Sequence, residues 1–72
     1  MGNRQKSKSK KYTPYHEEFS RPDGSYGGLL CRNTRGLWAA TWNMIPADDD
    51  DSAYQYSSKF EAQQALERKY RR

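Results

Sequence analysis

The chain has very little of what most catalytic and metal-binding sites require. Its 72 residues include one histidine and one cysteine, so a zinc site lacks its usual ligands. No nucleophile lies beside a base, no carboxylate pair suggests a cleft, and no glycine-rich phosphate loop precedes a helix. We therefore expect a protein with no catalytic residue, no metal and no cofactor, and we expect that it is not an enzyme.

Other absences in the sequence bear on the cellular compartment of the protein. The lone cysteine, Cys31, excludes an intramolecular disulfide and fits a reducing compartment; we expect it to be a small buried side chain in a strand. The sequence has no apolar run long enough for a signal peptide or a membrane span. These features predict a cytoplasmic protein that does not interact with membranes.

Large aliphatic residues are also scarce. Residues 1–11 contain none after Met1, so we expect a disordered basic arm there, followed by one small domain over residues 12–72. The remaining 61 residues are a length at which a single core is marginal. We therefore expect both tryptophans of the stretch GLWAATWN, Trp38 and Trp42, to be buried in that core.

Charge is unevenly distributed along the chain. The formal net charge is +4, but residues 12–67 hold only four basic residues against all nine acids. A uniformly basic nucleic-acid module would not show this pattern. The arm could be a solubilising tail, but we favour contact with phosphates or an acidic protein surface, without sequence specificity. Its basic residues are Arg4, Lys6, Lys8, Lys10 and Lys11.

The order of strand and helix signals predicts an α+β fold: a small antiparallel three-stranded sheet packed on one C-terminal helix. The expected strands are Tyr26–Arg32, Leu37 to about Met44, and a short Ala53–Ser57, with a hairpin loop at 33–36. Whether residues 12–20 add a fourth strand is left open by the sequence. The acidic run Asp48–Asp51 is expected to be a solvated turn, because it lacks the spaced ligands of a calcium loop.

The helix signal is the clearest in the chain. Ser58 and Glu61 form a capping box, in which Ser58 is the N-cap and Glu61 reaches back to the Ser58 amide. A set of residues then recurs at helical spacing and forms one narrow face of the helix, which we expect to pack on the sheet. Its residues are Ala62, Ala65, Leu66, Lys69 and Tyr70.

The pattern G-x-W-x-A-x-W, an acidic loop, and the Ser58-x-x-Glu61 helix start resemble the arm-type N-terminal domains of phage integrases and plant ethylene-response-factor domains. In the DNA-binding members of that group, the sheet face opposite the helix enters the major groove and is rich in Arg and Lys. The corresponding face here offers Leu37, Ala39 and Thr41 on the middle strand, with Arg32 and Arg35 near the hairpin. This resemblance implies the alternative function, a DNA-binding sheet-plus-helix module.

The whole chain, a basic tail ahead of a tiny sheet-and-helix body, resembles the small bacteriophage transcription regulators that bind host bacterial RNA polymerase, among them one from a Xanthomonas phage. The resemblance implies a protein in the host bacterial cytoplasm that inhibits initiation by σ-factor displacement and promotes antitermination. We expect a monomer whose partner is host RNA polymerase, with possible non-specific nucleic-acid contact through the arm.

Tyrosine and arginine are enriched in the hot spots of protein interfaces, and this chain has both near its expected first strand and hairpin. We therefore expect these residues to bind the partner. The sequence leaves open which polymerase subunit is bound, the direction of regulation and whether the arm contacts DNA. It also leaves open that the chain is a fragment of a larger protein. The expected partner-binding residues are Tyr12, Tyr15, Phe19, Arg21, Tyr26, Arg32 and Arg35.

Overall fold

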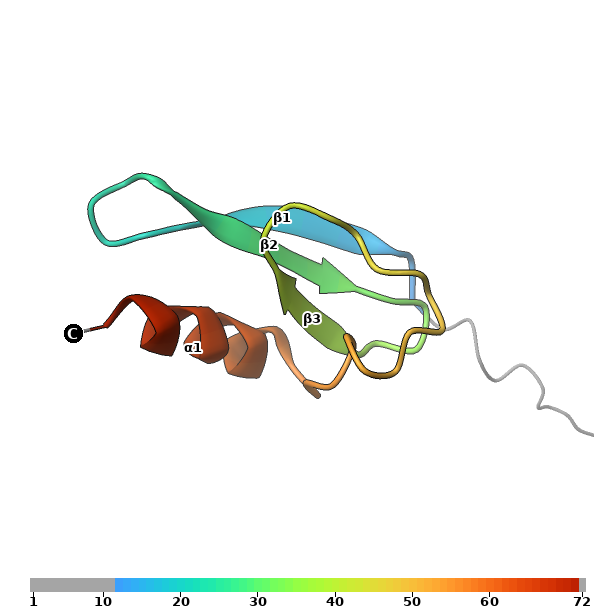
Figure 1. The fold of residues 1–72 in the computed structure, drawn as a ribbon. Helices are drawn as coiled ribbons and strands as arrows, with labels where there is room; N and C mark the ends of the chain where they lie inside the picture. Colours follow the sequence, from blue (N-terminus) through green and yellow to red (C-terminus); the bar gives the residue numbers. More distant parts are fainter. Residues whose placement is uncertain (1–11, 72) are drawn as a thin grey trace, which may run out of the picture.

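The computed structural model describes residues 12–71, so the arm expected over residues 1–11 lies outside the described residues. A three-stranded antiparallel sheet in the order β1-β2-β3 packs against one C-terminal helix (Figure 1). The expected α+β class is confirmed. The elements are β1 (Tyr15–Ser20), β2 (Tyr26–Arg32), β3 (Trp38–Thr41) and α1 (Lys59–Tyr70).

The identity of the three strands differs from the expectation. Residues 15–20, which the sequence left open, form β1 and pair with β2 from Tyr15–Arg32 onward. The segment Ala53–Ser57 is not a strand, and of its residues only Tyr56 bridges Trp38, through backbone hydrogen bonds of 2.8 and 3.1 Å.

A local turn explains why residues 53–57 do not extend into a strand. The Asp50 carboxylate accepts hydrogen bonds from the Ser52 hydroxyl at 2.7 Å and from the Ser52 amide at 3.2 Å. The Asp50 carbonyl accepts from the amides of Ala53 and Tyr54, both at 3.1 Å. Aspartate and serine side chains that bond to nearby backbone groups in this way favour turns over strands.

One face of the sheet forms a core with α1. Its buried residues are contributed by all four elements: Phe19, Leu30, Trp38, Ala62 and Leu66. The helix packs mainly against β2 and β3. Within the sheet, position 28 requires glycine, because a Cβ atom there would lie 2.6 Å from the Thr41 carbonyl oxygen of β3, at a φ of +133°.

The opposite face of the sheet carries a second small core. Cys31 and Ala39 lie under Tyr54, whose hydroxyl donates to the Pro46 carbonyl at 2.9 Å. The segment between β3 and α1 crosses this face, on the side away from the helix (Figure 1). The sheet is therefore the middle layer, between α1 and the segment that follows β3. The expected burial of Cys31 is confirmed. Burial raises the pKa of its thiol.

The two tryptophans have different environments. Trp38 is 8% exposed and lies in the core beneath α1, as expected. Trp42 is 50% exposed, so the expectation that both indoles are buried is wrong for Trp42. The reason is that β3 ends at Thr41, where the chain leaves the sheet, and the alternation expected to continue to Met44 stops there.

The helix begins as expected, with one difference in the cap. The Ser58 hydroxyl accepts from the Glu61 amide at 3.2 Å, which confirms Ser58 as the N-cap. The Glu61 carboxylate instead accepts from the Ser57 amide at 3.1 Å and the Ser57 hydroxyl at 3.0 Å, and not from Ser58. Of the expected helix face, Ala62 and Leu66 are buried, Ala65 and Tyr70 are half-buried, and Lys69 is exposed.

Candidate interaction surface

Arg32, at the end of β2, lies among three aromatic rings. Its guanidinium carbon is 5.2 Å from the ring centre of Tyr12, 5.7 Å from that of Tyr15 and 6.0 Å from that of Trp38. One guanidinium nitrogen donates to the Thr13 carbonyl at 2.6 Å. Arg32 therefore attaches the segment before β1 to the sheet, through cation–π contacts that are strongest when the cation is partly desolvated.

Arg21 and Phe19 meet the end of α1. The guanidinium carbon of Arg21 lies 4.3 Å from the ring centre of Tyr70, and the Phe19 ring stacks on Tyr70 with centres 6.5 Å apart. The Tyr70 hydroxyl donates to the Gly27 carbonyl at 2.6 Å. These contacts fix the C-terminal end of α1 against β2, and Phe19 is itself buried.

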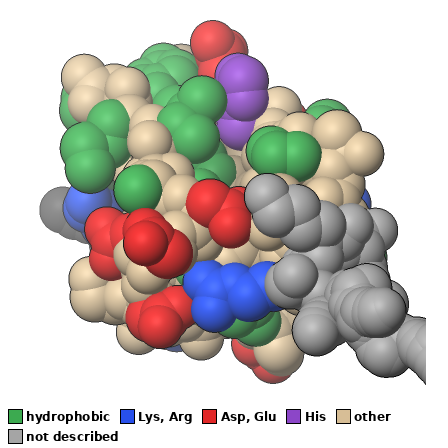
Figure 2. All heavy atoms as spheres, turned by 90° about the vertical axis from the view of Figure 1, so that its right-hand side faces the viewer, with side chains coloured by type: hydrophobic (Ala, Val, Ile, Leu, Met, Phe, Trp, Pro, Cys, Tyr) green, Lys and Arg blue, Asp and Glu red, His purple; other side chains and the backbone are tan. Residues whose placement is uncertain are grey.

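Arg35 holds the acidic segment against the turn between β2 and β3. It forms an ion pair with Asp51 at 2.9 Å and donates to the Asp48 carbonyl at 3.1 Å. The Asp48 carboxylate accepts from the Thr34 amide and hydroxyl, both at 2.8 Å. Figure 2 shows acidic side chains gathered around a basic one at this end of the domain. The acidic run is thus an exposed turn, as expected, and these contacts also hold it against the hairpin.

Asn33 is the buried residue that organises this turn, and sequence reasoning missed it. It is 1% exposed. Its side-chain oxygen accepts from the amides of Arg35 at 3.0 Å and Leu37 at 2.9 Å, and its side-chain amide donates to the Asp48 carbonyl at 3.2 Å. Asparagine in a short hairpin loop is the signal that could have indicated this role.

The sheet face opposite α1 is covered by the segment that follows β3. Leu37 and Ala39, which the DNA-binding resemblance places on the groove-reading strand, pack beneath that segment with Tyr54. The segment also carries the four consecutive aspartates Asp48–Asp51. Carboxylates at this position would repel a phosphate backbone.

A second exposed region is more apolar. It consists of Tyr26 and Trp42, together with Met44, which follows Trp42 by two residues in the chain, and we name it the Trp42 patch. The Tyr26 and Trp42 rings meet edge to face with centres 4.9 Å apart, and the Tyr26 hydroxyl donates to the Trp42 carbonyl. The three side chains are 36%, 50% and 60% exposed, respectively. Because Trp42 was expected in the core, sequence reasoning included only Tyr26 in the interaction surface.

The expected partner-binding residues do not form one continuous surface. Tyr12, Tyr15 and Arg32 come together at the start of β1. The other four are distributed over three places, and their role in binding a partner stays a prediction. Phe19 and Arg21 lie at the end of α1, Tyr26 lies in the Trp42 patch, and Arg35 lies beside the acidic loop.

An ion pair joins β1 to the first turn of α1. Lys59 Nζ lies 2.7 Å from Glu17 Oε2, and the Tyr15 hydroxyl donates to Glu17 Oε1 at 2.7 Å. The hydrogen bond from Lys59, followed by that from Tyr15, lowers the pKa of Glu17, and the same pair raises the pKa of Lys59.

This ion pair predicts an acid-dependent change in stability. A folded-state pKa below the unfolded value means that Glu17 stabilises the fold above its unfolded pKa and that this contribution is lost as the pH falls through the folded value. We expect Glu17→Gln to lower the melting temperature slightly at neutral pH and to have no such effect in strong acid. Melting curves across the acidic range test this. Glu18→Gln is the control, and an equal loss for Glu17→Gln at all pH values would contradict the assignment.

Residues 12–71 contain no group of three or more His, Cys, Asp or Glu side chains that could hold a metal ion. No helix within this part of the chain has the length and apolar character needed to cross a membrane. No family model, no curated protein and no solved structure matches the chain.

Proposed function

We propose that this protein is a non-enzymatic regulator that acts by binding another protein, and that the partner is host bacterial RNA polymerase. The partner, the bacteriophage origin and the mechanism come from the resemblance to phage transcription regulators. In that mechanism, the bound protein displaces σ factor, inhibits initiation and promotes antitermination. The observation that carries the binding of a protein is the exposed Trp42 patch.

The chemistry of the Trp42 patch supports a protein partner. Tryptophan and tyrosine are the residues most enriched in interface hot spots, and methionine is enriched at interfaces as well. The edge-to-face contact and the hydroxyl–carbonyl hydrogen bond hold Tyr26 and Trp42 in place before binding. A preorganised pair loses little conformational freedom on association, so more of the contact energy remains as affinity.

The closed sheet face also favours a protein partner over DNA. In the DNA-binding alternative, the face opposite α1 enters the major groove, but here that face is covered by Tyr54 and Ala53 of the segment that follows β3. Arg35, which would contact DNA in that alternative, is paired with Asp51. The basic arm would then supply non-specific contact with nucleic acid or with an acidic surface of the polymerase.

The affinity of single-residue variants for purified bacterial RNA polymerase core enzyme tests this proposal. We expect Trp42→Ala to weaken binding by about 30-fold, the loss typical of a hot-spot residue. Phe60→Ala is the matched control, because Phe60 is 66% exposed in the first turn of α1. We expect the control to change the affinity by less than about threefold, as for most exposed contacts.

Two outcomes would count against the proposal. One is wild-type protein that does not bind the polymerase at all. The other is binding to duplex DNA that falls steeply with salt and is reduced by neutralising Arg32 or Arg35, which supports the DNA-binding alternative instead.

A further inference from the structure

A hollow of about 440 Å³ lies between the turn that joins β1 to β2 and the C-terminal end of α1. Cations from both elements line it: Arg21, Lys69 and Arg71. Arg68, in the last turn of α1, is exposed, as are Lys69 and Arg71. We name these four residues the basic cluster.

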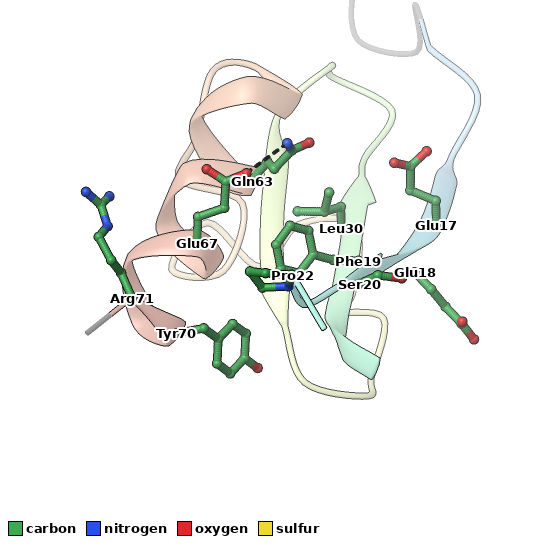
Figure 3. Close-up of a pocket in the computed structure, with 10 residues that line it drawn as sticks. All are labelled: Glu17, Glu18, Phe19, Ser20, Pro22, Leu30, Gln63, Glu67, Tyr70 and Arg71. Atoms are coloured by element: carbon green, nitrogen blue, oxygen red, sulfur yellow. Dashed lines mark hydrogen bonds between the residues drawn. The ribbon is translucent and has the colours of Figure 1, made fainter. Parts of the chain in front are cut away.

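The charge of the basic cluster is not balanced by neighbouring acids. The carboxylate that lines the hollow, Asp23, accepts hydrogen bonds from the Ser25 amide at 2.9 Å and the Ser25 hydroxyl at 2.7 Å. Glu67 accepts from Gln63 at 3.2 Å, and the Arg71 side chain extends away from that of Glu67 (Figure 3). Within the described part of the chain, no carboxylate forms an ion pair with a member of the basic cluster.

The helix dipole explains only part of the basic cluster. The C-terminal end of an α-helix carries about half a negative elementary charge, which stabilises cations in its last turn. This accounts for Arg68 and Lys69. Arg21 instead directly follows β1, so two separate elements bring like charges together. A surface with an excess of one charge attracts ligands of the opposite charge, here an anion.

Arg21 is held in place by an aromatic ring. Its guanidinium carbon lies 4.3 Å from the ring centre of Tyr70, whose hydroxyl donates to the Gly27 carbonyl at 2.6 Å. The Nε of Arg21 is buried and has no hydrogen-bond acceptor among the described residues. A guanidinium stacked on a ring can still offer its planar N–H edge to an anion, and this edge matches two oxygens of a phosphate group.

The basic cluster lies at the end of the domain opposite the acidic loop. Figure 1 shows the turn between β1 and β2 at the end where α1 terminates, and the turn between β2 and β3 at the other end of the sheet. Asp48 and Asp51 are bound at that other turn, by Thr34 and Arg35. A domain with its charges separated in this way is steered towards a polyanion with its basic end first.

We propose that the basic cluster binds the phosphate backbone of a nucleic-acid duplex, without reading its sequence. Sites for single strands present aromatic rings on which bases stack, whereas the Tyr70 ring is already in contact with Arg21 and Phe19. A protein partner would need apolar anchors, and of the residues that line the hollow only Pro22 is both apolar and exposed.

The basic cluster lies next to the Trp42 patch. Gly27, which accepts from the Tyr70 hydroxyl, directly follows Tyr26, and the Tyr26 ring contacts that of Trp42. A protein bound to the polymerase through the Trp42 patch would therefore place the basic cluster beside that interface, where it could contact a duplex held by the enzyme. This consequence rests on the proposed function, whereas duplex binding by the protein alone does not.

Titration of a fluorescent DNA duplex of mixed sequence with the full-length protein, in the absence of polymerase, tests the proposal. Lys69→Gln combined with Arg71→Gln removes two exposed charges of the basic cluster. We expect this variant to bind about tenfold more weakly at about 50 mM salt, with a log–log salt slope that is smaller by about two. Circular dichroism checks that the variant is folded.

The matched control is Arg35→Gln combined with Lys59→Gln, which removes the same total charge from other parts of the domain. We expect the control to change the affinity by less than about threefold, because neither residue would contact a phosphate. Amide signals locate the contact: on addition of duplex, those of residues 21–25 and 68–71 should shift, and those of residues 47–52 should not.

Four outcomes would overturn the proposal. They are the absence of duplex binding, equal losses of affinity in the two double variants, shifts confined to signals outside residues 21–25 and 68–71, and tighter binding to a single strand of the same sequence. Association between copies of the protein that is lost in the Lys69→Gln and Arg71→Gln variant would overturn it as well, because it would assign the basic cluster to the acidic loop of a second copy.

Discussion

Trp38→Ala is expected to destabilise the domain by about 3–5 kcal/mol, the range for removing a buried aromatic side chain from a core. Small domains are stable by only about 5–15 kcal/mol, and this one is at the lower end of the sizes that fold alone. Trp38 contacts α1 residues of the core, bridges Tyr56 through its backbone and borders Arg32 and Tyr15. We therefore expect this variant to be largely unfolded at physiological temperature.

Trp42→Ala is the matched comparison, four residues away. Since the Trp42 side chain is half-exposed and its carbonyl still accepts from Tyr26, we expect a loss of less than about 1 kcal/mol. Urea denaturation followed by circular dichroism measures both variants. Equal losses of stability would show that Trp42 belongs to the core, and this would remove the main support for the Trp42 patch as a binding surface.

Asn33→Ala is expected to destabilise the domain by about 2–3 kcal/mol, because a buried hydrogen-bonding residue is removed and its partners lose their bonds. The amides of Arg35 and Leu37 and the carbonyl of Asp48 would be affected together. Asn43→Ala is the control, since Asn43 is exposed.

A second measurement separates loosening of the acidic loop from general destabilisation. The segment that Asn33 anchors at Asp48 also covers Cys31 through Tyr54. We expect the Cys31 thiol to react with a thiol reagent faster in Asn33→Ala, under conditions where the variant is still folded, than in wild type or Asn43→Ala. Wild-type stability and an unchanged thiol reaction rate would contradict the role assigned to Asn33.

The helix and the fold class were predictable from the sequence because their signals are local. Ser58 caps α1, and the spacing of Ala62 and Leu66 marks the face that is buried. Which segments form strands depends on contacts between residues that are distant in the sequence. Residues 15–20 form β1 because Phe19 reaches a core built from β2 and α1, whereas residues 53–57 are held in turns by Asp50.

The candidate site was less predictable for a related reason. Composition identifies arginines and tyrosines, but it does not tell which of them the fold itself uses. Arg32 is occupied by aromatic rings from two separate segments, and Arg35 by an acidic loop 13 to 16 residues further along. The exposure of Trp42 depends on where β3 ends, and period-two alternation alone predicted a longer strand.

The most direct measurement is the binding of the full-length protein to purified bacterial RNA polymerase core enzyme, free of nucleic acid, with and without saturating σ factor. The proposed function predicts direct binding to the core enzyme, competition between the protein and σ, and loss of affinity for Trp42→Ala but not for Phe60→Ala. It would be contradicted by a protein that does not bind core enzyme and instead binds duplex DNA in a steeply salt-dependent manner through its basic residues.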